Sequence, residues 1–126
     1  MITSKHYTEA DFNRCTPSCS LQDMNQSTMD MLDKATDISG VKYRFTSAAR
    51  TLEHEKSRGR AGTSSHVSRG NGAMAVDIAT PDSRTRFLVM KGLVGAGFTR
   101  IGINLASNFY HVDNSPNHDK RVIFTY

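Results

Sequence analysis

Ser64-Ser65-His66 leading to Ala75-Val76-Asp77-Ile78, and Phe109-Tyr110-His111-Val112-Asp113, are the stretches that decide the fold of this chain. Each places a histidine or an aspartate among apolar neighbours, a pattern typical of a buried strand. A buried carboxylate is costly unless it is paired, hydrogen-bonded or bound to a metal. Two imidazoles and one carboxylate fill three positions of a zinc ion and leave the fourth open, as catalytic zinc sites require. The candidate metal ligands are His66, Asp77 and His111.

A further carboxylate stands two residues after the second histidine of this set. Because side chains alternate along a strand, His111 and Asp113 share one face of it. We predict that Asp113 is the catalytic base, which takes a proton from metal-bound water. Two alternatives stay open: Asp113 could orient the imidazole of His111, or the strand could simply expose a polar face. If Asp113 is not the base, the remaining titratable residues near these motifs are His54, Glu53 and His118.

The same stretches carry the pattern of a known family. Residues 64–78 resemble the S-x-H-x-x-G-x-A-x-D signature of the D-alanyl-D-alanine carboxypeptidase family of zinc peptidases, which shares its fold with the hedgehog signalling domain. Residues 100–126 are similar to the family branch that ends in G-I-G, F-x-H-x-D and R-x-W-x-Y. Residues 46–50 resemble its S-x-Y-R strand end. The similarity extends over about residues 40–126.

The resemblance implies a role for each matching residue. His66, Asp77 and His111 would hold zinc, and Ser64 would contact the substrate. Arg50 would bind a carboxylate or a carbonyl of the substrate, a task that suits a planar guanidinium. Arg50 and Asp113 are therefore the expected catalytic residues, and Arg50 and Ser64 the expected substrate-binding residues.

The chain departs from the family pattern at two places. Eleven positions separate His66 from Asp77 where the family has seven, so about four extra residues within 67–74 must bulge out. Better-known members have a glutamate three residues before the last histidine, where this chain has Asn108. The branch with H-x-D lacks this glutamate as well.

The implied activity is a zinc-dependent peptidase that cleaves a peptide bond in or beside the D-amino-acid stem peptides of peptidoglycan. A phage or prophage lysis enzyme is a plausible setting. The rival hypothesis is a zinc-stabilised domain of the same fold that binds cell wall or peptide without turnover, and the missing glutamate favours it. The sequence leaves carboxypeptidase and endopeptidase activity both open, because the walls of the pocket come from the long loop at residues 57–72.

The rest of the chain predicts one domain of the α+β class, a small antiparallel sheet backed by helices. Residues 1–39 form a helical part and residues 40–126 the part with the metal site. We expect helices that start at Thr8, at Ser20 and at Asp82 or Ser83, the second of them closed by Gly40, and a helical turn over 51–56. Expected strands lie at residues 41–46, 73–78, 98–103, 108–112 and 122–126.

Composition and charge exclude several classes of protein. No apolar stretch approaches the roughly 20 residues of a membrane span. The first residues lack the apolar core of a signal peptide, which predicts cytoplasmic synthesis and action on the cell wall after release. Residues 1–39 hold three basic and six acidic side chains, and residues 40–126 hold thirteen basic and six acidic ones. The basic residues lack the interleaved aromatics of single-strand binders, so we expect no nucleic-acid partner.

The two cysteines are interpreted structurally. Cys15 and Cys19 flank a proline-containing turn, and no further thiolate or imidazole stands at the spacing of a zinc site. A local disulfide is the alternative, although cytoplasmic chains usually keep their thiols reduced. The oligomeric state is not indicated by any feature of the sequence.

Overall fold

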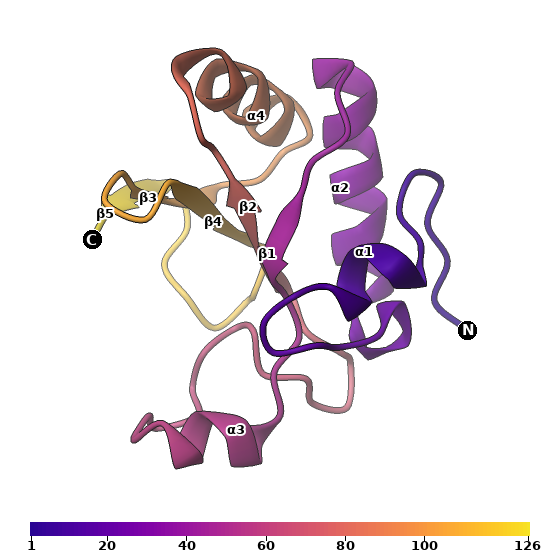
Figure 1. The fold of residues 1–126 in the computed structure, drawn as a ribbon, viewed down its shortest axis with the longest axis vertical. Helices are drawn as coiled ribbons and strands as arrows, with labels where there is room; N and C mark the ends of the chain where they lie inside the picture. The colour runs from indigo at the N-terminus through magenta and orange to yellow at the C-terminus, as the bar shows by residue number, and fades with distance from the viewer.

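The computed structural model describes residues 1–126 as a five-stranded sheet with α2 and α4 packed together on one side of it and α3 lying apart from them (Figure 1). The spatial order of the strands is β1-β2-β4-β3-β5. The helices are α1 (Glu9–Asn13), α2 (Gln26–Ser39), α3 (Leu52–Ser57) and α4 (Ser83–Gly95), with a short 3-10 helix at Leu21–Asp23. The strands are β1 (Phe45–Ser47), β2 (Ala75–Ala79), β3 (Arg100–Asn104), β4 (Phe109–Asp113) and β5 (Val122–Thr125).

The α+β class is confirmed, with one difference in the sheet. Strands β1, β2, β4 and β3 pair antiparallel, as predicted, but β5 pairs parallel to β3, so the sheet is mixed. The reason is the connection: residues 114–121 leave β4 beside the start of β3 and cross to the other side of β3 at that same start, so β5 begins beside Arg100 and runs in the direction of β3. The first strand is also shorter than the expected 41–46 and contains only Phe45–Ser47.

Helix starts follow the predicted caps with one correction. The side chains of Thr8 and Asp11 form the expected capping box at α1, and the Asp82 side chain caps α4. Ser20, however, caps only the short 3-10 helix, and α2 starts separately after Asn25, whose Oδ1 accepts the N–H of Thr28 at 3.0 Å. The break arises because Met24 is extended and bridges to Ala73, which ties this segment to the loop before β2.

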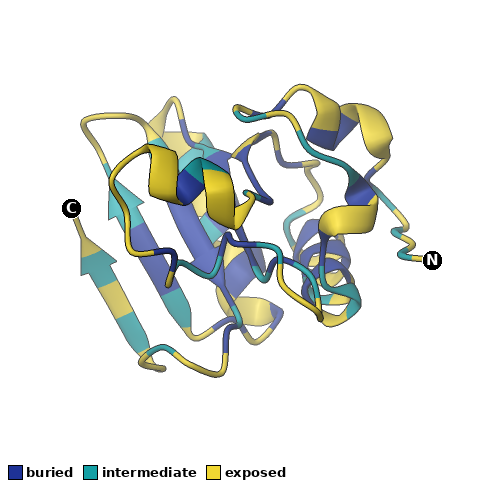
Figure 2. Ribbon diagram, turned by 90° about the horizontal axis from the view of Figure 1, so that it is seen from below, coloured by how far each residue is buried: buried dark blue, intermediate teal, exposed yellow.

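The two faces of the sheet differ in chemistry. Alternate residues of β2, β3 and β4 enter the apolar core that α2 and α4 complete: Val76, Ile78, Ile101, Tyr110 and Val112. Figure 2 shows the buried residues concentrated in the central strands, whereas β5 at the edge is largely exposed or half-buried. The residues between these core positions point to the opposite face. That second face carries the polar side chains that the sequence singled out.

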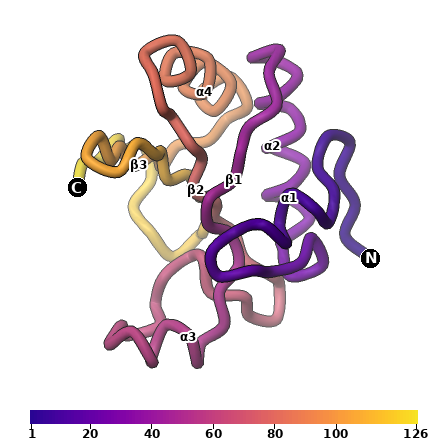
Figure 3. The backbone as a smooth tube through the Cα atoms, viewed as in Figure 1, coloured from indigo at the N-terminus to yellow at the C-terminus, as the bar shows by residue number.

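The backbones of α2 and α4 approach each other closely in the core (Figure 3). A Cβ atom on Gly92 of α4 would lie 1.9 Å from the Tyr43 hydroxyl and 2.5 Å from the Ala35 carbonyl oxygen, so only glycine fits there. No helix in the structure combines the length and the apolar character needed to cross a membrane.

Candidate metal centre

A row of paired residues across the second face of the sheet forms the floor of the site. Asp77 of β2 lies opposite His111 of β4, which lies opposite Gly102 of β3, which lies opposite Phe124 of β5. A Cβ atom on Gly102 would lie 2.5 Å from the Phe124 ring, so the glycine lets this ring lie flat across β3. The ring thereby reaches His111, at 5.8 Å between centroids.

The loop between α3 and β2 brings His66 over this row. Its backbone is fixed to the segment that follows β1: Arg50 N–H donates to the His66 carbonyl at 2.8 Å, and Ser68 N–H donates to the Arg50 carbonyl at 2.9 Å. The extra residues of the His66–Asp77 spacing form a turn over 69–72 that packs on the start of α2, where Asn25 Nδ2 donates to the Asn71 carbonyl at 2.9 Å. The longer spacing is therefore absorbed in this turn.

Three ligand atoms converge where these segments meet. His66 Nε2 lies 3.1 Å from His111 Nδ1, and Asp77 Oδ1 lies 3.2 Å from each of these two nitrogens. All three residues are buried. The structure thus brings together the three residues that the sequence proposed as metal ligands, with candidate ligand atoms of the whole set within 4.8 Å of one another.

The outer hydrogen bonds of the two imidazoles determine which nitrogens face inward without a proton. His66 Nδ1 lies 2.8 Å from the Ala48 carbonyl, which can only accept, so this nitrogen carries the proton. His111 Nε2 lies 2.6 Å from Asp113 Oδ2 and donates to that carboxylate. In the neutral histidines, His66 Nε2 and His111 Nδ1 therefore present lone pairs, as Asp77 Oδ1 also does. Three acceptors facing one another without a donor need a cation between them.

These residues fit a zinc ion. In a tetrahedral shell with bonds of about 2.0–2.1 Å, neighbouring ligand atoms are about 3.3 Å apart. The three observed separations of 3.1–3.2 Å are close to that value. Zinc sites built for catalysis use three protein ligands and keep one position for water or substrate. The donor set and the spacing of this cluster therefore suit a catalytic site better than a closed structural one.

The electrostatics of the cluster also favour a cation. Burial alone would raise the pKa of Asp77, but His111 and His66, which donate to Asp77 and attract it once they take up a second proton, outweigh burial and lower that pKa well below its usual range. Burial would lower the pKa of His111, yet its hydrogen bonds to Asp113 and Asp77 raise it. Without a metal, the cluster therefore holds a proton more tightly than a free histidine does.

Asp113, which the sequence suggested as the base, lies behind His111. Its Oδ2 accepts from His111 Nε2 at 2.6 Å and from Arg100 Nε at 3.1 Å, and its Oδ1 accepts the Ser115 N–H at 3.3 Å. Only 1% of this residue is exposed. Burial opposes ionisation, but the bond from His111 prevails and lowers the pKa of Asp113. This geometry favours the alternative in which Asp113 orients the imidazole of His111.

Arg50 lies at the rim of the cluster within a second buried network. Its guanidinium donates to the Ser47 hydroxyl at 3.0 Å and to Glu55 Oε1 at 2.9 Å, and lies 3.6 Å from Asp77 Oδ2. Glu55 is fully buried and also accepts from Arg60 at 3.2 Å. Burial would raise the pKa of Glu55, but hydrogen bonds from the two arginines lower it. Glu55 thus holds Arg50 at the edge of the cluster.

The cluster opens into a hollow of about 420 Å³. Arg50 and Ser64 line it together with the metal ligands, as the sequence predicted for substrate contacts, and Asp113 contributes to its wall. The Ser64 hydroxyl also accepts the His66 N–H at 3.2 Å, so this serine shapes the loop as well. His118, which the sequence offered only as a remaining candidate for the base, also lines the hollow. Wall residues to which the sequence gave no role are Arg60, Ser65, Arg100, Phe109, Phe124 and Tyr126.

Sequence reasoning missed some of these residues because of where they lie. Glu55 follows Glu53 on a short polar helix and has the pattern of an exposed residue, yet it is completely buried. Only the fold shows that the helix turns this carboxylate toward Arg50. For Arg100 a signal existed: it precedes the Ile-Gly-Ile stretch on a strand, which places it on the same face as Gly102.

We expect Glu55→Gln to lower the free energy of unfolding by on the order of 3 kcal/mol at neutral pH, because it leaves two arginines beside a neutral group. Since the pKa of Glu55 is lowered in the folded protein, its contribution is present above the usual glutamate pKa of about 4.3 and is lost as the pH falls further. Denaturant titrations at several pH values measure this.

The control for this variant is Glu53→Gln on the same helix, where the side chain is exposed. It should unfold like the wild type at every pH. Equal stability of the two variants at neutral pH would contradict a structural role for the buried carboxylate.

The comparisons with known proteins agree with this geometry. Residues 4–113 match the model of the family described as Peptidase M15. The match includes the three candidate ligands and Arg50 and ends at Asp113, before the 114–121 segment and β5. No curated protein and no solved structure gives a significant match. Since the match covers most of the chain, this protein belongs to the peptidase M15 family, whose members are metal-dependent peptidases.

Proposed function

We propose that this protein is a zinc-dependent peptidase that cleaves the stem peptides of peptidoglycan. The observation that carries the proposal is the convergence of three candidate ligand atoms, His66 Nε2, Asp77 Oδ1 and His111 Nδ1, in a hollow open to solvent. Membership of the peptidase M15 family supports the reaction class. The resemblance to D-alanyl-D-alanine carboxypeptidases supports the cell-wall substrate. The protein would reach this substrate after its release from the cell that makes it.

The residues of the hollow divide the work between binding and positioning. A zinc ion held by the three ligands would lower the pKa of a bound water to about 7 and polarise the scissile carbonyl. Arg50 lines the hollow and would bind a carbonyl or carboxylate of the peptide. Asp113 would keep His111 in the tautomer that presents Nδ1, because its oxygen holds the Nε2 proton.

Arg50→Lys tests the proposed peptide anchor. A lysine retains the charge but has no planar guanidinium. It therefore cannot bond Ser47 and Glu55 and at the same time offer further N–H groups to a substrate. A charge-assisted hydrogen bond is worth about 1.5–3 kcal/mol, so we expect kcat/KM to fall by roughly 10–100-fold with zinc content unchanged. Steady-state kinetics and elemental analysis measure the two quantities.

The matched control is Arg44→Lys, an exposed arginine just before β1. It should keep full activity. If Arg50→Lys is equally active, Arg50 has only its structural bonds and the anchor lies elsewhere.

The decisive experiment for the function is digestion of purified peptidoglycan by the zinc-loaded protein, with the fragments identified by mass spectrometry. Loss of terminal D-alanine would identify a carboxypeptidase, and cleavage within the stem or cross-link would identify an endopeptidase. The rival is a zinc-stabilised domain that binds without turnover, which the missing glutamate at Asn108 favours. Binding of zinc and of wall fragments with no product released would support that rival and contradict the peptidase.

A further inference from the structure

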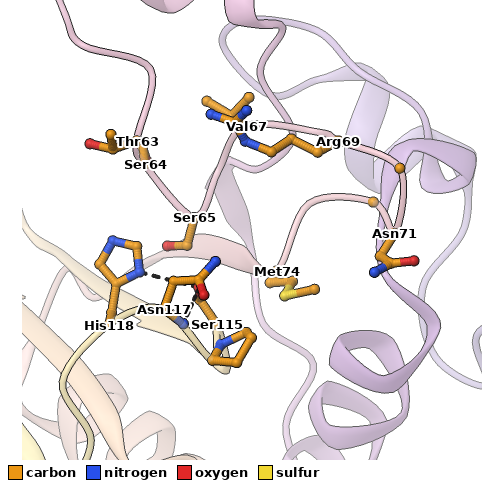
Figure 4. A pocket seen from close by; sticks show the side chains of 13 residues that line it. Thr63, Ser64, Ser65, Val67, Arg69, Asn71, Met74, Ser115, Asn117 and His118 are labelled. Carbon is orange, nitrogen blue, oxygen red and sulfur yellow. Dashed lines mark hydrogen bonds between the residues drawn. The ribbon is translucent and has the colours of Figure 1, made fainter.

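A second hollow, polar and about 250 Å³ in volume, adjoins the one above the metal ligands. It is formed by the loop before β2 and the segment after β4, and the two hollows share Ser64, Ser65 and His118. Figure 4 shows the imidazole of His118 at the edge of this second hollow, on the same side as Ser65. A peptide that runs from one hollow into the other would therefore pass His118.

The groups around the metal ligands leave few candidates for proton transfer. Both oxygens of Asp113 accept hydrogen bonds from His111, Arg100 and Ser115. Glu55 is fully buried between two arginines and does not line the hollow. The Tyr126 side chain is exposed, and a phenol has an ordinary pKa of about 10, so this residue stays protonated at neutral pH. The imidazoles and carboxylates that line the hollow are the three ligands, Asp113 and His118. Asp113 is paired with His111 and Arg100, so His118 is the only remaining one without an ion pair.

His118 is held in a defined orientation. Its Nδ1 lies 3.2 Å from the hydroxyl of Ser115, which is buried and also accepts the Asn117 N–H at 3.3 Å. The hydroxyl can either accept from Nδ1 or donate to it, so the imidazole can change tautomer without losing this partner. Nε2 has no partner within the protein and is available to a molecule in the hollow.

The segment that carries His118 is also fixed to the residues behind the metal ligands. Ser115 N–H donates to Asp113 Oδ1 at 3.3 Å, and Arg100 Nη1 donates to the Asp119 carbonyl at 3.4 Å. Lys120 Nζ donates to the Ser115 carbonyl at 3.4 Å. Asp113 thus holds the imidazole of His111, and Arg100 holds Asp113. The same two residues, Asp113 and Arg100, also hold the segment before and after His118.

We infer that His118 is the residue that transfers the proton during peptide hydrolysis, an inference that rests on the proposed function. Nε2 takes a proton from the attacking water while its oxygen bonds to the carbonyl carbon. Nε2 then gives this proton to the amide nitrogen as the carbon–nitrogen bond breaks. The products are an amine and a carboxylic acid, which loses its remaining proton to solvent. The absent glutamate of the better-known family members is thereby replaced from a different segment of the chain.

The test is His118→Gln, assayed with the zinc-loaded protein on peptidoglycan and on N-acetylated D-Ala-D-Ala. Glutamine keeps a polar group beside Ser115 but cannot carry the proton. We expect kcat to fall by roughly 10²–10⁴, the usual contribution of general acid–base catalysis. Zinc content should stay at that of the wild type. Dipeptide affinity of the zinc-free protein, measured by calorimetry, should also be unchanged, because proton transfer plays no part in binding.

Two further variants separate proton transfer from a structural role. Imidazole added in solution should raise the turnover of His118→Ala by about tenfold, because it supplies the missing proton carrier. It should leave the turnover of the wild type unchanged. His54→Gln is the matched control, a partly exposed histidine of α3 that lines neither of the two hollows, and it should be fully active.

Three results would overturn the inference in distinguishable ways. If the wild type turns over and His118→Gln retains kcat within a few-fold, the proton carrier is another group. Loss of zinc in His118→Gln would make this histidine a ligand instead. If the wild type binds zinc but cleaves neither substrate, the proposed peptidase fails and the role of His118 fails with it.

Discussion

Replacement of any one of His66, Asp77 and His111 by alanine is expected to remove tight zinc binding and all turnover. Zinc sites with four protein ligands bind with about 10–16 kcal/mol, which corresponds to about 2.5–4 kcal/mol for each ligand. Loss of one ligand should therefore weaken zinc binding by roughly 10²–10³-fold. Competition with a chromophoric chelator measures the affinity, and elemental analysis of the purified variants gives the metal content.

The stability of these variants should change in a characteristic way. In the metal-free wild type, the three ligand atoms lie 3.1–3.2 Å apart and hydrogen bonds between them stabilise the charged Asp77, and alanine removes one partner of this buried cluster. The metal-free variants should therefore unfold at a lower denaturant concentration than the metal-free wild type. Zinc at a concentration of about 100 Kd should stabilise the wild type by about 2.7 kcal/mol and the variants hardly at all.

Residues of the same types outside the cluster, a partly exposed histidine and an exposed aspartate, provide the controls. His54→Ala on α3 and Asp30→Ala on α2 should both keep the zinc-dependent stabilisation of the wild type. If Asp77→Ala binds zinc as tightly as the wild type, the carboxylate is not a ligand and the centre is wrongly assigned. If no variant and no wild-type sample retains zinc under metal-replete conditions, the zinc proposal is wrong.

How much of this site could be predicted follows from how local each signal is. Asp77 and His111 sit in apolar strands with a period of two, so their burial and their face were readable from the sequence alone. The same reasoning placed Asp113 beside His111 on that face. The period of the strand could not show which nitrogen of the His111 imidazole would bond Asp113. That choice depends on His66 and Asp77, which approach Nδ1 and leave Nε2 to Asp113.

The parts that the sequence did not predict depend on contacts between distant segments. The break between the short 3-10 helix and α2 is caused by pairing with Ala73, which stands about fifty residues later. The parallel pairing of β5 depends on a crossing loop that has no pattern of its own. Glu55 lies on a short helix and was not predicted, and His118 lies in a loop and was named only as one of three remaining candidates for the base, because periodicity gives no information on direction in such segments.

Asp113→Asn is the variant that decides between the two roles considered for this carboxylate. The structure favours the positioning role, because Oδ2 holds the Nε2 proton of His111 at 2.6 Å. Asparagine has the same shape but is a neutral and weaker acceptor, so the imidazole becomes a poorer ligand. We expect zinc affinity to fall by about 10–100-fold, the usual effect of losing such a partner. At saturating zinc, turnover should then recover to within about tenfold of the wild type.

A catalytic base would give the opposite pattern. If Asp113 takes the proton, the asparagine variant should hold zinc as the wild type does and lose roughly 10²–10⁴ in turnover even at saturating zinc. That result would return the base to Asp113 and contradict the role inferred for His118. Asp119→Asn is the matched control, because this exposed aspartate of the same segment contributes only its backbone carbonyl to Arg100. Because zinc affinity and zinc-saturated turnover are measured separately, this one variant shows whether Asp113 supports zinc binding through His111 or transfers the proton.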